Sequence, residues 1–137
     1  MHGHLGGLPP QVDLAAEKAL AELLREGVGL LTSAHDLSDG GLAQALVEAC
    51  LPGDVGVNVK LGEDAFIALF SESAGRALVT VPAADEARLV DLAARHGVPA
   101  QQLGATGGEV IAVDGAFEVP VAEVREAWTR TLPDALG

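Results

Sequence analysis

Cysteine and aromatic residues are scarce in this 137-residue sequence, and each scarcity excludes some kinds of cross-link, metal site or core. Cys50 is the single cysteine, which excludes an internal disulfide and any metal site built from several thiolates. It lies on a helical apolar stripe, so we expect a small buried hydrophobe there rather than a nucleophile. Three phenylalanines, one tryptophan and no tyrosine leave the core to leucine, valine, alanine and isoleucine, which suits helices packed on a sheet.

Basic residues are also few. Eight lysines and arginines stand against 20 aspartates and glutamates, which gives a formal net charge of −12. Binding of nucleic acid requires clustered lysine and arginine to displace phosphate counterions, and an anionic membrane surface would repel this chain. The composition therefore predicts no nucleic-acid partner and no membrane partner. A phosphate ligand would have to be held by backbone N–H groups, a few arginines or a bridging cation.

Long hydrophobic runs are missing as well. No stretch approaches the roughly 20 apolar residues that span a bilayer, and none resembles a secretory signal, so we expect a cytoplasmic protein. Without internal repeats or a long linker, the length predicts a single domain at residues 12–132, after an extended lead-in at 1–11 and before a tail at 133–137. His2 and His4 in the lead-in are expected to be inert rather than metal ligands.

Hydrophobic periodicity predicts an alternation of helices and strands. Apolar residues at helical spacing predict helices at residues 12–27, 42–50, 85–95 and 121–130, with a further short helix within 63–73. In the helix at 85–95, Leu89, Val90 and Ala93 are expected to face inward. Strands are predicted at residues 28–34, 55–61 and 76–81, with two or three more between residues 101 and 121. This order is neither a strict βαβ repeat nor all-β, so we expect the α+β class, with a mixed sheet and helices packed on it.

The polar motif "HDLSDGG" at residues 35–41 lies where the predicted strand, ending near Ala34, meets the next helix. Asp39 or Ser38 is placed to cap that helix. Gly40 and Gly41 permit positive φ and leave their amides open to a ligand oxygen. Because two aspartates would repel a bare phosphate, a divalent cation between carboxylate and phosphate is the functional interpretation.

A simpler interpretation of the motif competes with this one, and the spacing alone favours it. Asp36 and Asp39 would accept hydrogen bonds from backbone amides in a tight turn, and His35 would pack against a neighbour. The motif lacks the frame of a phosphate-binding P-loop, and neither a dinucleotide fingerprint nor a GxSxG nucleophile elbow occurs in the chain.

Two further segments carry polar or glycine-rich patterns. "FSESAGR", residues 70–76, places Glu72, Ser73 and Arg76 before a predicted strand, and a guanidinium suits a carboxylate or phosphate. The alternative is that Glu72 and Arg76 pair with each other. "GATGG", residues 104–108, is expected to be a hairpin turn rather than a phosphate cradle, because predicted strands flank it.

These motifs together resemble the C-terminal domain of the phosphoribosylformylglycinamidine synthase family, within the superfamily of aminoimidazole ribonucleotide synthetase. The resemblance rests on "SAHDLSDGGLAQALVEACL" and "FIALFSESAGRALVTVP", with support from "LGGLPPQVDL" and "LGATGG", and it covers about residues 5–132. It implies a three-layer α/β/α domain. It also implies an ATP-driven ligase reaction in purine biosynthesis, in which formylglycinamide ribonucleotide and ammonia from glutamine give the amidine, ADP and phosphate.

The resemblance also implies limits. Family enzymes are much longer, and their N-type domains carry most nucleotide, metal and catalytic residues. We therefore expect a fragment that is inactive alone, with no catalytic residue of its own. ATP and magnesium would belong to the whole enzyme, and the partners would be the other domains of its own chain, a glutaminase subunit and a small accessory subunit. Ala74 departs from the family pattern, in which a glutamine follows the acid-serine pair, and this fits a domain facing the non-catalytic twin of the active site.

The candidate site combines both polar segments, and its ligand stays open between substrate, a structural nucleotide and neighbouring domains. The rival hypotheses are a free-standing interaction module, or another member of the superfamily such as a hydrogenase maturation factor. The candidate site residues are His35, Asp36, Ser38, Asp39, Gly40, Gly41, Glu72, Ser73 and Arg76.

Overall fold

The computed structural model describes residues 11–62 and 64–137, and it alternates helices and strands as the periodicity predicts. The predicted lead-in, with His2 and His4, lies outside the described residues except for Gln11. The elements are α1 (Leu14–Gly27), β1 (Ser33–Asp36), α2 (Gly41–Cys50), β2 (Val57–Val59), α3 (Ala65–Phe70), β3 (Ala77–Thr80), η1 (Ala83–Asp85), α4 (Glu86–Arg95), β4 (Gly104–Thr106), β5 (Val110–Val113), β6 (Phe117–Pro120) and α5 (Val121–Leu136).

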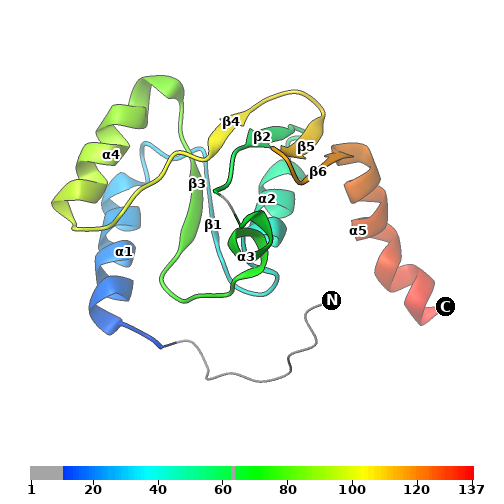
Figure 1. The fold of residues 1–137 in the computed structure, drawn as a ribbon, viewed down its shortest axis with the longest axis horizontal. Helices are drawn as coiled ribbons and strands as arrows, with labels where there is room; N and C mark the ends of the chain where they lie inside the picture. Colours follow the sequence, from blue (N-terminus) through cyan, green and yellow to red (C-terminus); the bar gives the residue numbers. More distant parts are fainter. Residues whose placement is uncertain (1–10, 63) are drawn as a thin grey trace.

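The strands form two sheets. β1 and β3 make an antiparallel two-stranded ribbon, and the other four strands form a mixed sheet in the order β4-β2-β5-β6, in which β2 and β5 are parallel. In Figure 1 the ribbon lies between the pair α1 and α4 on one side and α2 and α3 on the other. The predicted α+β class, with a mixed sheet and helices packed on it, is confirmed.

The main core lies between α2 and the mixed sheet. Alternation places Val57 and Val59 of β2 inward and Asn58 outward, as the two-residue period predicts. Ile111 and Val113 of β5 are buried beside them. The α2 side of this core is the predicted apolar stripe, in which Leu42, Ala45, Leu46 and Cys50 are all buried.

A second, smaller apolar cluster joins α1 to α4. It contains Leu23 of α1 with Leu92 and Ala93 of α4. The prediction for this helix was partly wrong, because Val90 is half exposed and Leu92 takes the inward position. The helical period alone does not determine which side of a helix is buried. In α4 the buried side is the one that packs against α1.

Two strand predictions need correction, both because pairing is not local. The strand expected at residues 28–34 is displaced, since β1 covers Ser33–Asp36 opposite β3. "GATGG" is not a hairpin turn, because Gly104–Thr106 is strand β4 and pairs with β2 rather than with β5. A Cβ at Gly104 would overlap the carbonyl oxygen of Asn58, so glycine allows this close approach.

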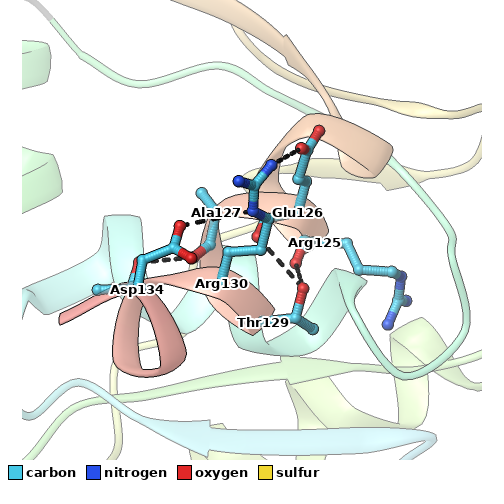
Figure 2. A network of polar contacts seen from close by, with 7 residues as sticks. Arg125, Glu126, Ala127, Thr129, Arg130 and Asp134 are labelled. Atoms are coloured by element: carbon cyan, nitrogen blue, oxygen red, sulfur yellow. Dashed lines mark hydrogen bonds and ion pairs between the residues drawn. The ribbon is translucent and has the colours of Figure 1, made fainter. Parts of the chain in front are cut away.

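The helix α5 extends to Leu136, six residues beyond the predicted end at Arg130. Figure 2 shows the polar side of this helix, where Arg130 donates to Glu126 at 2.8 Å and lies 3.5 Å from an oxygen of Asp134. Such exposed pairs contribute only about 0.3–0.5 kcal/mol each, but they support a helix whose last turns leave the domain surface. At its start, Arg125 binds the Leu51 carbonyl oxygen and Asp54, which attaches α5 to the end of α2.

The end of α1 carries a titratable pair. Glu26 accepts a hydrogen bond from Nε2 of His96 at 2.9 Å, and this bond, with help from Arg95, lowers the pKa of Glu26 below the 4.5 usual for a glutamate. A carboxyl group with a lowered pKa in the folded state stabilises the fold above its unfolded pKa, and that contribution disappears as the pH falls through the folded pKa.

We therefore expect Glu26→Gln to lower the thermal midpoint at pH 7, with a difference from the unchanged chain that shrinks as the pH falls toward and through the lowered pKa of Glu26. Thermal unfolding from pH 3.5 to 7 measures this. Glu118→Gln, on the exposed side of β6, is the matched control. A constant difference across this range would contradict the assigned role of the Glu26–His96 pair.

Candidate functional site

The two polar segments predicted as one site meet at one end of the β1–β3 ribbon. Antiparallel pairing places Asp36, at the end of β1, opposite Ala77, at the start of β3. The segment that follows β1 therefore lies beside the segment that precedes β3, and the Leu37 N–H donates to the Arg76 carbonyl at 3.2 Å. The pairing of distant strands brings together residues 35–41 and 72–76.

Leu37 anchors the first segment. Its side chain is buried in the main core, whereas Asp36, Ser38 and Asp39 on either side of it are exposed. Because Leu37, in the middle of the turn, must face the core, the polar side chains on either side of it point to solvent. Among the described residues, the carboxylates of Asp36 and Asp39 accept no hydrogen bond, so the simpler interpretation, in which they bind backbone amides, is wrong there.

The start of α2 is held by a contact from the other segment. Neither Ser38 nor Asp39 caps the helix with its side chain, contrary to the prediction. Instead, Oε1 of Glu72 accepts a hydrogen bond from the Gly40 N–H at 2.8 Å, and the Gly41 N–H donates to the Ser38 carbonyl at 3.0 Å. Both glycine amides, expected to be open to a ligand, are therefore already engaged. The sequence could not reveal this, since Glu72 lies 32 residues away.

The two glycines adopt the predicted left-handed backbone, with φ of 83° at Gly40 and 62° at Gly41. A Cβ on Gly41 would lie 2.7 Å from the Leu69 carbonyl oxygen and 3.2 Å from the carbonyl oxygen of Ser71. The absence of a side chain at Gly41 thus lets the end of α3 approach α2. That approach holds Glu72 within reach of Gly40.

The predicted pairing of Glu72 with Arg76 is not found. Nη1 of Arg76 donates to the Ser71 carbonyl and to Oγ of Ser73, both at 3.4 Å. These long bonds close the loop before β3 and leave the guanidinium half-buried beside the end of β1. Arg76 is therefore the cation of the site, and Glu72 is engaged at α2.

His35 has a neighbour that the sequence analysis missed. Its Nδ1 lies 4.0 Å from an oxygen of Glu48, and the other oxygen of Glu48 accepts from Nε2 of Gln44 at 3.1 Å. Gln44 and Glu48 are one helical turn apart, on the side of α2 that faces β1. The clue in the sequence was this polar pair at i,i+4 within an otherwise apolar helix.

The described residues contain no group of three or more histidine, cysteine, aspartate or glutamate side chains placed to hold a metal ion. Asp36, Asp39 and Glu72 make the site acidic, yet they do not form a closed set of metal ligands. Across residues 11–62 and 64–137, no helix is both long and apolar enough to cross a membrane. The site contains a backbone N–H at a helix start that donates to the carboxylate of Glu72, one guanidinium and two exposed carboxylates.

Comparison with known proteins gives a consistent set of likenesses. The family model described as AIR synthase related protein, C-terminal domain, matches residues 1–114. Phosphoribosylformylglycinamidine synthase subunit PurL of Nocardioides sp. is 64% identical over 137 residues, which are all of this chain and 18% of that protein. The chain thus spans less than a fifth of the length of this curated relative.

Two solved structures from Thermotoga maritima share the fold. PurL complexed with ATP matches with a TM-score of 0.74 and 31% identity, over 82% of this chain and 22% of that one. The structure of PurLQS matches with a TM-score of 0.70 and 32% identity, over 80% of this chain and 21% of that one.

Proposed function

Because the chain belongs to the family of AIR synthase related C-terminal domains, we propose that it is one domain of a phosphoribosylformylglycinamidine synthase. In this proposal the whole enzyme converts formylglycinamide ribonucleotide, ATP and glutamine-derived ammonia to the amidine. This domain contributes binding surface and no catalytic residue. Its small share of the relatives' length supports the view that it is inactive alone.

One observation supports the proposed site most strongly. The Gly40 N–H, at the start of α2, holds an oxygen of the Glu72 carboxylate at 2.8 Å, and the two groups come from the two segments that carry the family resemblance. An amide at a helix start favours anionic oxygen, and here that oxygen belongs to Glu72, so a phosphate would bind beside this position rather than on the Gly40 N–H. We propose that this edge is half of a phosphate or nucleotide site whose other half lies on a neighbouring domain.

In this proposal each polar residue of the site has a role that follows from its chemistry. Arg76, held loosely by two 3.4 Å bonds, would turn toward a bound phosphate, and His35, oriented by Glu48, would line the site. ATP, when bound to the whole enzyme, would supply the phosphoryl group that activates the substrate amide. Magnesium is assigned to the whole enzyme rather than to this domain, because the described residues lack a closed ligand set.

The partners and location follow from the same assignment. The Thermotoga PurL relative is solved in an assembly named PurLQS, which supports the proposal that the whole protein works with further subunits. We propose a glutaminase subunit and a small accessory subunit as those partners, together with the other domains of its own longer chain. A cytoplasmic location belongs to the proposal as well.

The test uses a chimera in which this chain replaces the matching segment of Nocardioides PurL; this protein is called the synthase chimera below. We expect Glu72→Gln or Asp36→Asn to lower its kcat/KM tenfold or more, about 1.4 kcal/mol of lost transition-state stabilisation. Asp91→Asn, on the exposed side of α4, is the control and should leave activity unchanged.

Calorimetric titration of the 137-residue chain with ATP and Mg²⁺ completes the test. We expect no turnover of ATP by the isolated chain. Turnover there would contradict the need for other domains. Full activity in both chimera variants would instead favour the rival hypothesis of an interaction module whose polar turn only shapes a helix start.

A further inference from the structure

Every aromatic side chain of this protein is on its surface. Phe66, Phe70, Phe117 and Trp128 are the only four aromatic residues in the sequence, and each exposes between 41% and 55% of its surface. Both apolar clusters are aliphatic apart from Cys50. Large aromatic groups are normally the main apolar content of a core, and on surfaces they concentrate where another protein binds.

Two of the four aromatic residues lie together on α3. The rings of Phe66 and Phe70 have their centroids 5.1 Å apart, and Ile67 between them is 61% exposed. We call these three residues the α3 apolar surface. Leu69 is the one residue of this helix that is buried in the main core. A six-residue helix thus presents three large apolar side chains outward and one inward.

This surface is coupled to the candidate site through the backbone. The carbonyls of Leu69 and Ser71, at the end of α3, lie against Gly41, and the next residue is Glu72, whose carboxylate holds the Gly40 N–H. A partner that packs on Phe70 would therefore also fix the position of Glu72. Binding sites commonly lie where two domains meet, because each domain contributes part of the wall.

We propose that the α3 apolar surface is the docking surface for another domain of the same long polypeptide, and that docking there positions Glu72. The proposal rests on the proposed function, since the occupant is the remainder of the synthase. The match covers 18% of the Nocardioides relative and 22% of the Thermotoga chain, so most of the polypeptide in those proteins has no counterpart here. The occupant is an apolar protein surface, because three adjacent aliphatic and aromatic side chains offer no charge to an ionic ligand.

Amide hydrogen exchange tests the proposal without relying on activity. A helix of six residues with one buried side chain should exchange quickly when uncovered and slowly when a domain packs on it. We expect the amides of residues 65–71 to exchange about tenfold or more slowly in the synthase chimera than in the 137-residue chain. Equal rates in the two proteins would overturn the proposal. Protection in the 137-residue chain that rises with its concentration would overturn it too, in favour of a second copy.

A matched pair of variants assigns the protection to the side chains. Ile67→Ser should leave the urea midpoint of the 137-residue chain unchanged but abolish the extra protection of α3 in the chimera. Val90→Ser, a half-exposed β-branched residue in α4, is the control and should preserve that protection. Loss of protection in both variants would contradict a role specific to α3.

The outcome is separable from that of the proposed function. If the chimera is active and its site variants behave as expected, but α3 exchanges freely, only the docking surface is wrong. If α3 is protected while Glu72→Gln and Asp36→Asn retain full activity, the docking surface stands and the proposed site fails.

Discussion

Replacing Gly41 with alanine is expected to destabilise the protein by about 2–4 kcal/mol and to separate the two halves of the candidate site. Two costs add. An alanine at φ 62° is strained, and its Cβ would lie 2.7 Å from the Leu69 carbonyl oxygen. Because that oxygen belongs to backbone, α3 must move as a whole, and the Glu72 carboxylate then leaves the Gly40 N–H. Urea denaturation measures the loss of stability.

Gly40→Ala is the matched control for this prediction. Gly40 also has positive φ, but a Cβ there would meet only the side chain of Gln44, at 2.8 Å, and that chain is able to rotate away. The cost should be limited to backbone strain, about 1–2 kcal/mol. Equal losses in the two variants would mean that the close approach of α3 to Gly41 contributes nothing.

The second large effect is expected in the main core. Ile111 is 1% exposed and lies on β5, opposite Val57 of β2 on one side and Val119 of β6 on the other. Ile111→Ala should cost about 2–5 kcal/mol, since it removes buried methyl groups and leaves a cavity between α2 and the sheet. A small domain is stable by only about 5–15 kcal/mol, so this one change would remove a large part of the total.

A graded series checks that the loss comes from packing. Ile111→Val removes one methylene and should cost about 0.5–1.5 kcal/mol, so the alanine variant must cost clearly more. Ala112, the next residue on the strand, lies on the opposite face of the sheet and is only partly exposed. Ala112→Ser there is expected to stay within about 0.5 kcal/mol of the unchanged chain. Equal losses of unfolding free energy in Ile111→Ala and Ile111→Val would contradict the assignment of Ile111 to the core.

The sequence predicted well those features that depend on local periodicity. The helices α1 and α2, the alternation of β2 and the positive φ of Gly40 and Gly41 were all predictable from neighbours along the chain. The resemblance to the synthase family is confirmed by the matching family model and by the relatives. The α+β class followed from the order of elements, although the first strand is displaced to Ser33–Asp36 and Gly104–Thr106 is a strand rather than a turn.

Two of the misses share one physical cause, which is long-range pairing. The segment "GATGG" was taken for a turn because nothing local shows that Gly104 pairs with Val59 of a distant strand. Spacing predicts a side-chain cap of α2 from Ser38 or Asp39, the nearest candidates, but neither caps it, and the distant Glu72 instead binds the N–H of Gly40. Both contacts form only after the chain has folded back, so a reading based on spacing assigns them to the wrong residues.

The division of the protein into two apolar clusters bears on how its sequence can diverge. Leu37, Leu42 and Leu69, which hold the polar turn and the end of α3 in place, all belong to the larger cluster, whereas Leu23 and Leu92 belong to the smaller one. Substitutions at the α1–α4 junction therefore do not change the core residues that hold the polar turn in position. We expect homologous proteins to drift freely at that junction and to keep the volume and shape of the residues under the turn.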